Sequence, residues 1–95
     1  MSRRAVERRL RQVGAQLKNL REELAVADEQ LAHLTEEADD ARLRALVSET
    51  PGADKEHRDA DRHAEAMRRH RDEVGAEIVR LESTQDDLLD ELTAQ

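Results

Sequence analysis

The sequence predicts an all-α protein made of two long helices that form an antiparallel coiled-coil helical hairpin. Three observations support this fold class. Strong helix formers, chiefly Ala, Leu, Glu and Arg, dominate the 95 residues, and no aromatic residue is present to fill a globular core. Apolar residues recur at alternating spacings of four and three, which is the heptad pattern of coiled coils. The only proline, Pro51, lies beside Gly52 near the middle of the chain, where a helix would be interrupted.

The first predicted helix covers residues of about 3–47. Charged residues make up 41% of the chain, which can also indicate disorder, so the periodicity decides between the two. Twelve successive positions of the repeat are apolar. The a positions are Leu10, Leu17, Leu24, Leu31, Ala38 and Ala45, and the d positions are Val6, Val13, Leu20, Ala27, Leu34 and Ala41. A stripe of this length predicts that one face of the helix packs along a partner helix.

The repeat resumes after Gly52 and predicts a second helix over residues of about 54–93. Its seam positions are Ala60, Ala64, Met67, Arg71, Val74, Ile78, Leu81, Gln85, Leu88 and Leu92. Arg71 and Gln85 are polar, and both occupy a positions. A polar a residue costs stability but fixes the alignment of the helices, so we interpret both as register determinants. The alternative is that they line a polar notch for a ligand.

Residues of about 48–53 are predicted to form the turn, so that residues 1–95 make a single helical hairpin. Thr50 precedes the proline and is therefore disfavoured in a helical conformation. Gly52 can adopt a positive φ without steric cost. The Asp54 carboxylate can then cap the second helix by accepting hydrogen bonds from backbone N–H groups.

The charge distribution supports antiparallel pairing. Residues 1–12 contain five arginines and one glutamate, whereas residues 72–95 contain one arginine and eight acidic residues. Folding the chain at Pro51 brings these segments together, and we expect the acidic segment to neutralise the basic one. In this register, facing residues have numbers that sum to about 98–105. The register predicts the flanking pairs Arg9–Glu91, Arg21–Glu82, Arg42–Asp61 and Glu37–His63.

Six aliphatic residues lie outside the strict seam: Val26, Leu43, Leu46, Val47, Val79 and Leu89. A two-helix hairpin covers only one face of each helix, so these residues favour homodimerisation into a four-helix arrangement. Leu43, Leu46 and Val47 lie close to the turn. Either the apolar stripe drifts around the first helix there, or these three residues form a separate patch.

The sequence argues against an enzyme, a cofactor and a metal site. A general acid or base needs a sheltered site that perturbs its pKa, and two paired helices offer none, so no catalytic residue is predicted. The histidines His57, His63 and His70 have no partner histidine four residues away, and we interpret them as flanking residues rather than zinc ligands.

Membrane and nucleic-acid partners are also not expected. The longest apolar run, residues 24–27, is far shorter than the roughly 20 residues that span a bilayer. The N-terminal arginines could contact phosphates, but the net charge is −7 and no aromatic side chain can stack on bases, so direct nucleic-acid binding is not favoured. The large excess of Arg over Lys, with abundant Ala, is typical of GC-rich bacterial genomes.

We therefore expect a cytoplasmic, non-catalytic protein–protein interaction module: a small coiled-coil adaptor, scaffold or regulatory subunit whose partner is another protein or a second copy. The interaction residues predicted near the turn are Leu43, Leu46, Val47, Glu49, Asp54 and Glu56. A hairpin with acids at its tip resembles the coiled-coil factors that enter the secondary channel of bacterial RNA polymerase and hold a catalytic Mg²⁺ there. That resemblance implies the alternative, a bacterial transcription regulator that binds RNA polymerase or a sigma factor.

Overall fold

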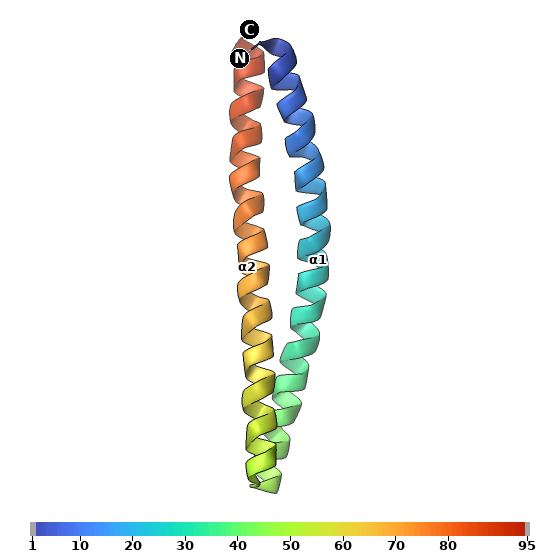
Figure 1. The fold of residues 1–95 in the computed structure, drawn as a ribbon, viewed down its shortest axis with the longest axis vertical. Helices are drawn as coiled ribbons and strands as arrows, with labels where there is room; N and C mark the ends of the chain where they lie inside the picture. The colour runs from blue at the N-terminus through green and yellow to red at the C-terminus, as the bar shows by residue number, and fades with distance from the viewer. Residues whose placement is uncertain (1, 95) are drawn as a thin grey trace. The chain divides into compact units, whose positions relative to one another are not determined.

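The computed structural model describes residues 2–94, which form two long helices, α1 over Arg3–Ser48 and α2 over Pro51–Ala94 (Figure 1). Within this range, only Ser2, Glu49 and Thr50 lie outside the helices. The predicted fold class is confirmed: the protein is all-α, and its two helices form a helical hairpin. Helix formers and the absence of internal prolines explain why each helix continues for more than forty residues.

Each helix begins with a hydroxyl cap. At the start of α1, the backbone N–H of Ala5 donates to Ser2 Oγ at 3.2 Å, and the N–H of Val6 donates to the Ser2 carbonyl at 3.0 Å. At the start of α2, the N–H of Ala53 donates to Thr50 Oγ1 at 3.2 Å. These contacts satisfy N–H groups that have no partner inside the helix.

The turn is tighter than predicted, and two expectations for it were wrong. Glu49 and Thr50 alone connect the helices, and Pro51 is the first residue of α2, where its fixed φ suits a helix and its missing N–H costs nothing. The positive φ belongs to Glu49, at 51°, and no glycine has one. Thr50 rather than Asp54 is the cap, because Pro51 and Gly52 are already helical.

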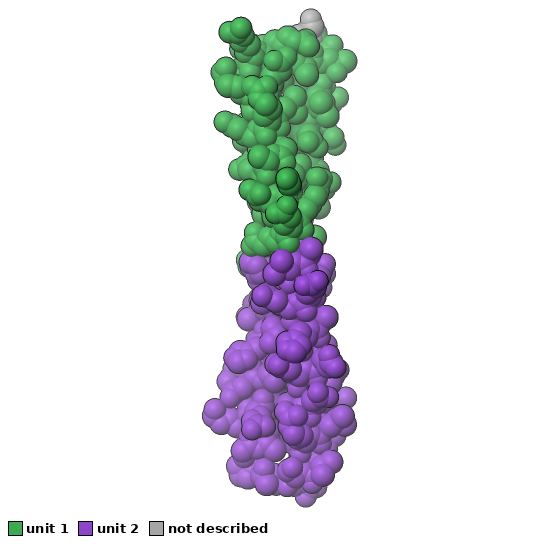
Figure 2. Space-filling view, turned by 90° about the vertical axis from the view of Figure 1, so that its right-hand side faces the viewer, with its two compact units in different colours: residues 1–24, 73–95 green, residues 25–72 purple. Residues whose placement is uncertain are grey.

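The chain divides into two compact units, coloured separately in Figure 2. Unit 1 consists of residues 1–24 and 73–95, and unit 2 consists of residues 25–72. Unit 1 pairs the first part of α1 with the last part of α2, and unit 2 contains the turn with the helix segments on either side of it.

Unit 1 has a core of large aliphatic side chains that come from the predicted seam. Its buried members are Val6, Val13, Leu17, Val74, Ile78, Leu81 and Leu88, and Leu10, Leu20, Leu24 and Leu92 pack against them. The predicted pair Arg21–Glu82 is confirmed beside this core, with Arg21 Nη2 at 3.3 Å from Glu82 Oε2. The register inferred from the repeat therefore holds in unit 1.

Unit 2 has a seam of small side chains. Its buried hydrophobic residues are all alanines, namely Ala27, Ala38, Ala41, Ala45 and Ala64, and the larger Leu31, Leu34 and Met67 are only half-buried. Alanine side chains bury little area, so this seam contributes less to stability than that of unit 1. The predicted pair Arg42–Asp61 was wrong, since Asp61 contacts His57 Nε2 at 3.0 Å instead.

The two polar seam residues are both half-buried. Arg71 Nε lies 3.7 Å from Asp28 Oδ1 on the facing helix and 3.4 Å from Asp72 Oδ1, and it is shielded from solvent without a hydrogen bond. The aliphatic stem of Arg71 therefore fills the seam while its charge stays near two carboxylates.

Replacing Glu49 with glycine should raise the free energy of unfolding by about 1 kcal/mol, because glycine adopts a positive φ without the steric cost of a Cβ atom. Urea denaturation measures the change. The matched control is Glu49→Ala, which removes the carboxylate but keeps the Cβ, and it should show no such gain. Equal stability of the two variants would contradict the assignment of strain to Glu49.

Replacing Thr50 with alanine should lower the free energy of unfolding by about 1 kcal/mol through loss of the cap on α2. The same denaturation experiment on Asp54→Ala should give a smaller loss, because Asp54 is not the cap. A larger loss for Asp54→Ala than for Thr50→Ala would reverse the assignment.

Candidate functional site

Leu43, Leu46 and Val47 form an exposed apolar patch on the last turns of α1, which we call the tip patch. Their exposed fractions are 56%, 66% and 85%, and the spacing of three and four places them on one side of the helix. Ala41 and Ala45 occupy the seam at the same level and are buried. The tip patch is therefore separate from the seam, and the apolar stripe does not drift around α1.

Two arginines border the tip patch. Arg42 follows the seam residue Ala41 and occupies an e position, and Arg44 precedes the seam residue Ala45 and occupies a g position. The e and g positions flank the outer b, c and f positions, which the tip patch occupies. Arg44 Nε lies 3.9 Å from Glu56 Oε2, whereas Arg42 makes no ion pair with any residue from 2 to 94. The patch thus lies between two helix positions that carry arginine. The sequence analysis missed this feature, although the heptad assignment contains it.

The three predicted tip acids have different surroundings. Glu49 lies in the connection, Asp54 lies in the first turn of α2, and Glu56 faces Arg44. Among residues 2–94, no three His, Cys, Asp or Glu side chains are grouped so that they could hold a metal ion. The arrangement implied by the resemblance to polymerase channel factors, acids gathered around Mg²⁺, is therefore not formed in the described part of the chain.

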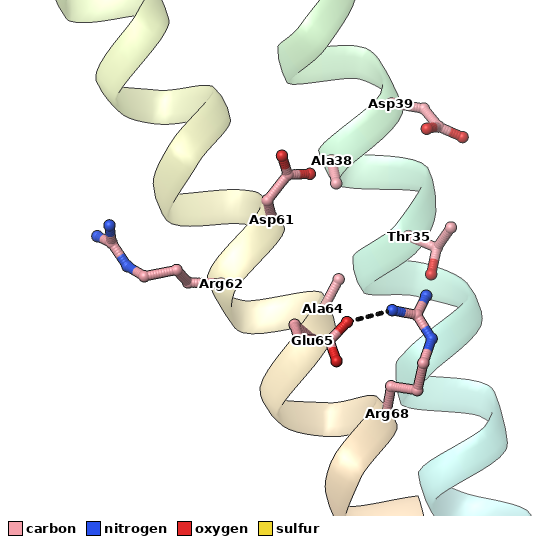
Figure 3. Close-up of a pocket in the computed structure, with 8 residues that line it drawn as sticks. All are labelled: Thr35, Ala38, Asp39, Asp61, Arg62, Ala64, Glu65 and Arg68. Atoms are coloured by element: carbon pink, nitrogen blue, oxygen red, sulfur yellow. Dashed lines mark hydrogen bonds and ion pairs between the residues drawn. The ribbon is translucent and has the colours of Figure 1, made fainter.

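Two shallow grooves flank the alanine seam of unit 2. One, of about 480 Å³, is drawn in Figure 3 and is lined by Thr35, Ala38, Asp39, Asp61, Arg62, Ala64, Glu65 and Arg68. Arg68 Nη1 contacts Glu65 Oε2 at 2.6 Å, and the Arg62 side chain points away from α1 (Figure 3). The other, of about 430 Å³, is lined by Glu37, Asp40, Ala41, Arg44, Glu56, Asp59, Ala60 and His63. Both are open to solvent and have alanine floors.

Histidines and acids form pairs along single helices. His33 Nε2 lies 3.1 Å from Glu37 Oε1, and His57 Nε2 lies 3.0 Å from Asp61 Oδ2, each one turn apart. These contacts lie along a helix surface. The predicted pair Glu37–His63 was wrong, since Glu37 contacts His33 instead.

Asp59, on the rim of the second groove, has an altered pKa. Its Oδ2 accepts a hydrogen bond from Lys55 Nζ at 3.0 Å, and its Oδ1 contacts Arg62 Nη2. The hydrogen bond and the positive charge of Lys55, with the charge of Arg62, lower the pKa of Asp59 below its ordinary value of 3.8. Asp59 therefore remains an anion, which suits an ion pair and not a general acid.

None of the five N-terminal arginines forms an ion pair with α2 among residues 2–94, so the predicted pair Arg9–Glu91 was wrong. Arg3 Nε pairs with Glu7 Oε1 at 3.2 Å within α1. Arg4, Arg8 and Arg11 are exposed and make no hydrogen bond or ion pair with residues 2–94. They occupy b and f positions, which point away from the seam and hence from the acids of α2.

Replacing Lys55 with methionine should raise the pKa of Asp59 toward 3.8, which NMR titration of the side-chain carboxyl carbon can measure. Because the folded-state pKa is lowered, the pair stabilises the fold above the ordinary pKa and loses this effect as the pH falls through the folded value. Lys55→Arg keeps the charge and is the control. An unchanged pKa in Lys55→Met would refute the attribution to Lys55.

Comparison with known proteins does not assign a family. No family model, curated protein or solved structure matches the chain. Within residues 2–94, neither helix contains a stretch that is long and apolar enough to cross a membrane.

Proposed function

We propose that this protein is a non-catalytic interaction module, a cytoplasmic adaptor, scaffold or regulatory subunit, that binds another protein through the tip patch. One observation carries the proposal. Close to the turn, the large aliphatic side chains Leu43, Leu46 and Val47 are exposed, and the seam residues Ala38, Ala41 and Ala45 are buried. This is the reverse of the usual distribution, and contiguous exposed apolar residues often mark binding sites.

The spacing of the tip patch suits a helix that lies in a groove. Anchors at i, i+3 and i+4 are the pattern by which an amphipathic helix inserts its apolar face into a partner. Burying one such side chain in a partner is worth about 1.5–3 kcal/mol, so the three together could dominate a small interface. The partner that fits best has an apolar groove with carboxylates on its rims, which would face Arg42 and Arg44.

The tip patch is too small for a stable dimer of this chain. Standard interfaces involve roughly 20–30 residues on each side, whereas the patch and its bordering residues number fewer than ten. Asp39 and Asp40 lie one turn before the patch on the same face of α1. If two patches paired across a two-fold axis, these acids would lie next to the C-terminal turn of the other copy's α1, which has no basic residue to pair with them. A different protein that supplies the larger, concave surface fits the patch better.

The test is a pull-down from a lysate of the source organism with wild type and with Leu43→Ser, Leu46→Ser, Val47→Ser. The matched control is Val26→Ser, Val79→Ser, Leu89→Ser, which removes the same number of exposed aliphatic side chains elsewhere. We expect the tip variant to lose a specific partner that the control keeps. Circular dichroism should show both variants folded, because none of the six residues is buried.

A partner retained by the tip variant, or lost equally by the control, would contradict a role for the tip patch. Arg42→Glu extends the test to the rim. It should weaken capture of the same partner, whereas Arg42→Lys should largely preserve it.

A further inference from the structure

The outer surface of α1 in unit 1 carries a row of unpaired arginines. Arg4, Arg8 and Arg11 are spaced by four and three, so they share one side of the helix, which we call the basic face. Lys18 continues it one heptad beyond Arg11. All four are exposed, and none makes a hydrogen bond or ion pair within the range 2–94.

The outer surface of α2 in the same unit carries the opposite charge. Asp86, Asp87 and Asp90 occupy b, c and f positions and are exposed; we call them the acidic face. They also make no ion pair or hydrogen bond with any described residue. Leu89, which is 46% exposed, lies beside them and adds apolar area.

The geometry of unit 1 directs these two faces outward, away from the seam. The a and d residues of each helix face the partner helix, so the f residues, Arg8 and Asp90, point in opposite directions, and the b and c residues point outward on the flanks. Two helices, each about 10–12 Å across with side chains, separate the faces. No ion pair joins the basic face to the acidic face among residues 2–94.

We propose that the basic face of α1 in one copy docks against the acidic face of α2 in a second copy. The observation that carries this is charge complementarity: neither face forms an ion pair within residues 2–94, and the two faces have opposite charge. The two faces lie on opposite sides of unit 1, so a copy that uses one face keeps the other free. The contact is therefore head-to-tail, and it produces open rows of molecules in place of a closed dimer.

A second copy accounts for both faces, whereas a polyanion accounts for only one. The chain has a net charge of −7, and nothing in the basic face resembles a stacking platform for bases, since the chain has no aromatic residue. A polyanion would also be repelled by the acidic face of the same molecule. The inference is independent of the tip patch, which lies in unit 2.

Sedimentation equilibrium of the purified protein tests the proposal. At about 0.05 M salt, the average mass should rise with concentration from 10.9 kDa past the mass of a dimer, because the rows do not close. At about 0.5 M salt, screening should return the mass to that of the monomer. A chain that stays at monomer mass in low salt, whether or not it binds heparin, overturns the proposal, and so does a mass that stops at a dimer.

Charge exchange identifies the surfaces. The variant Arg4→Glu, Arg8→Glu, Arg11→Glu should remain monomeric in low salt, and so should Asp86→Lys, Asp87→Lys, Asp90→Lys. An equimolar mixture of the two should associate, because every face of one variant then opposes the charge of the other. Failure of the mixture to associate would show that the faces do not meet.

Two control variants distinguish this contact from a general effect of net charge and from pairing through the tip patch. The first control carries the same change in net charge, but in unit 2: Arg58→Glu, Arg62→Glu, Arg69→Glu. Its association in low salt should be closer to that of the wild type than the association of Arg4→Glu, Arg8→Glu, Arg11→Glu is. The tip variant Leu43→Ser, Leu46→Ser, Val47→Ser should associate as the wild type does. If the tip variant is monomeric while Arg4→Glu, Arg8→Glu, Arg11→Glu still associates, the copies meet through the tip patch and the proposal is wrong.

Discussion

The structure depends on the packing of one stripe of each helix against the other. A pair of helices can bury only the a and d residues, and every other side chain must tolerate water. This constraint accounts for the high proportion of charged residues, because most of each helix surface is solvated. It also explains why the candidate functional residues lie on outer faces. A buried pocket needs a third element to close it, and the grooves beside the alanine seam remain open.

The seam could be predicted from the sequence, and the turn could not. The repeat identified every residue of the unit 1 core, including Leu17 and Leu81, because burial of apolar area is large and periodic. The turn depends on smaller competing preferences. Gly52 was predicted to have the positive φ and Asp54 to cap α2. Because Pro51 is the first residue of α2, the helix begins earlier, and Glu49 has the positive φ while Thr50 is the cap.

The candidate sites show a similar division. Exposure of Leu43, Leu46 and Val47 followed from their heptad positions, since none is at a or d. Ion pairs were less predictable. Arg21–Glu82 formed, but Asp61 contacts His57 in place of Arg42, because long exposed side chains choose among partners of nearly equal energy. Charge summed over a segment supported the antiparallel pairing but did not predict individual ion pairs, since it ignores the heptad positions of Arg4, Arg8 and Arg11.

The alanine seam of unit 2 has a consequence for local dynamics. Amide hydrogens exchange through local opening, and the free energy of opening is lowest where few apolar contacts hold the backbone. Ala38, Ala41 and Ala64 bury much less apolar area than Leu17, Ile78 and Leu81 do. We therefore expect the helix segments of unit 2 to open locally more often than those of unit 1, and their amide hydrogens to exchange faster. The tip patch, which we propose as the interaction surface, therefore lies in the unit with the smaller buried apolar area.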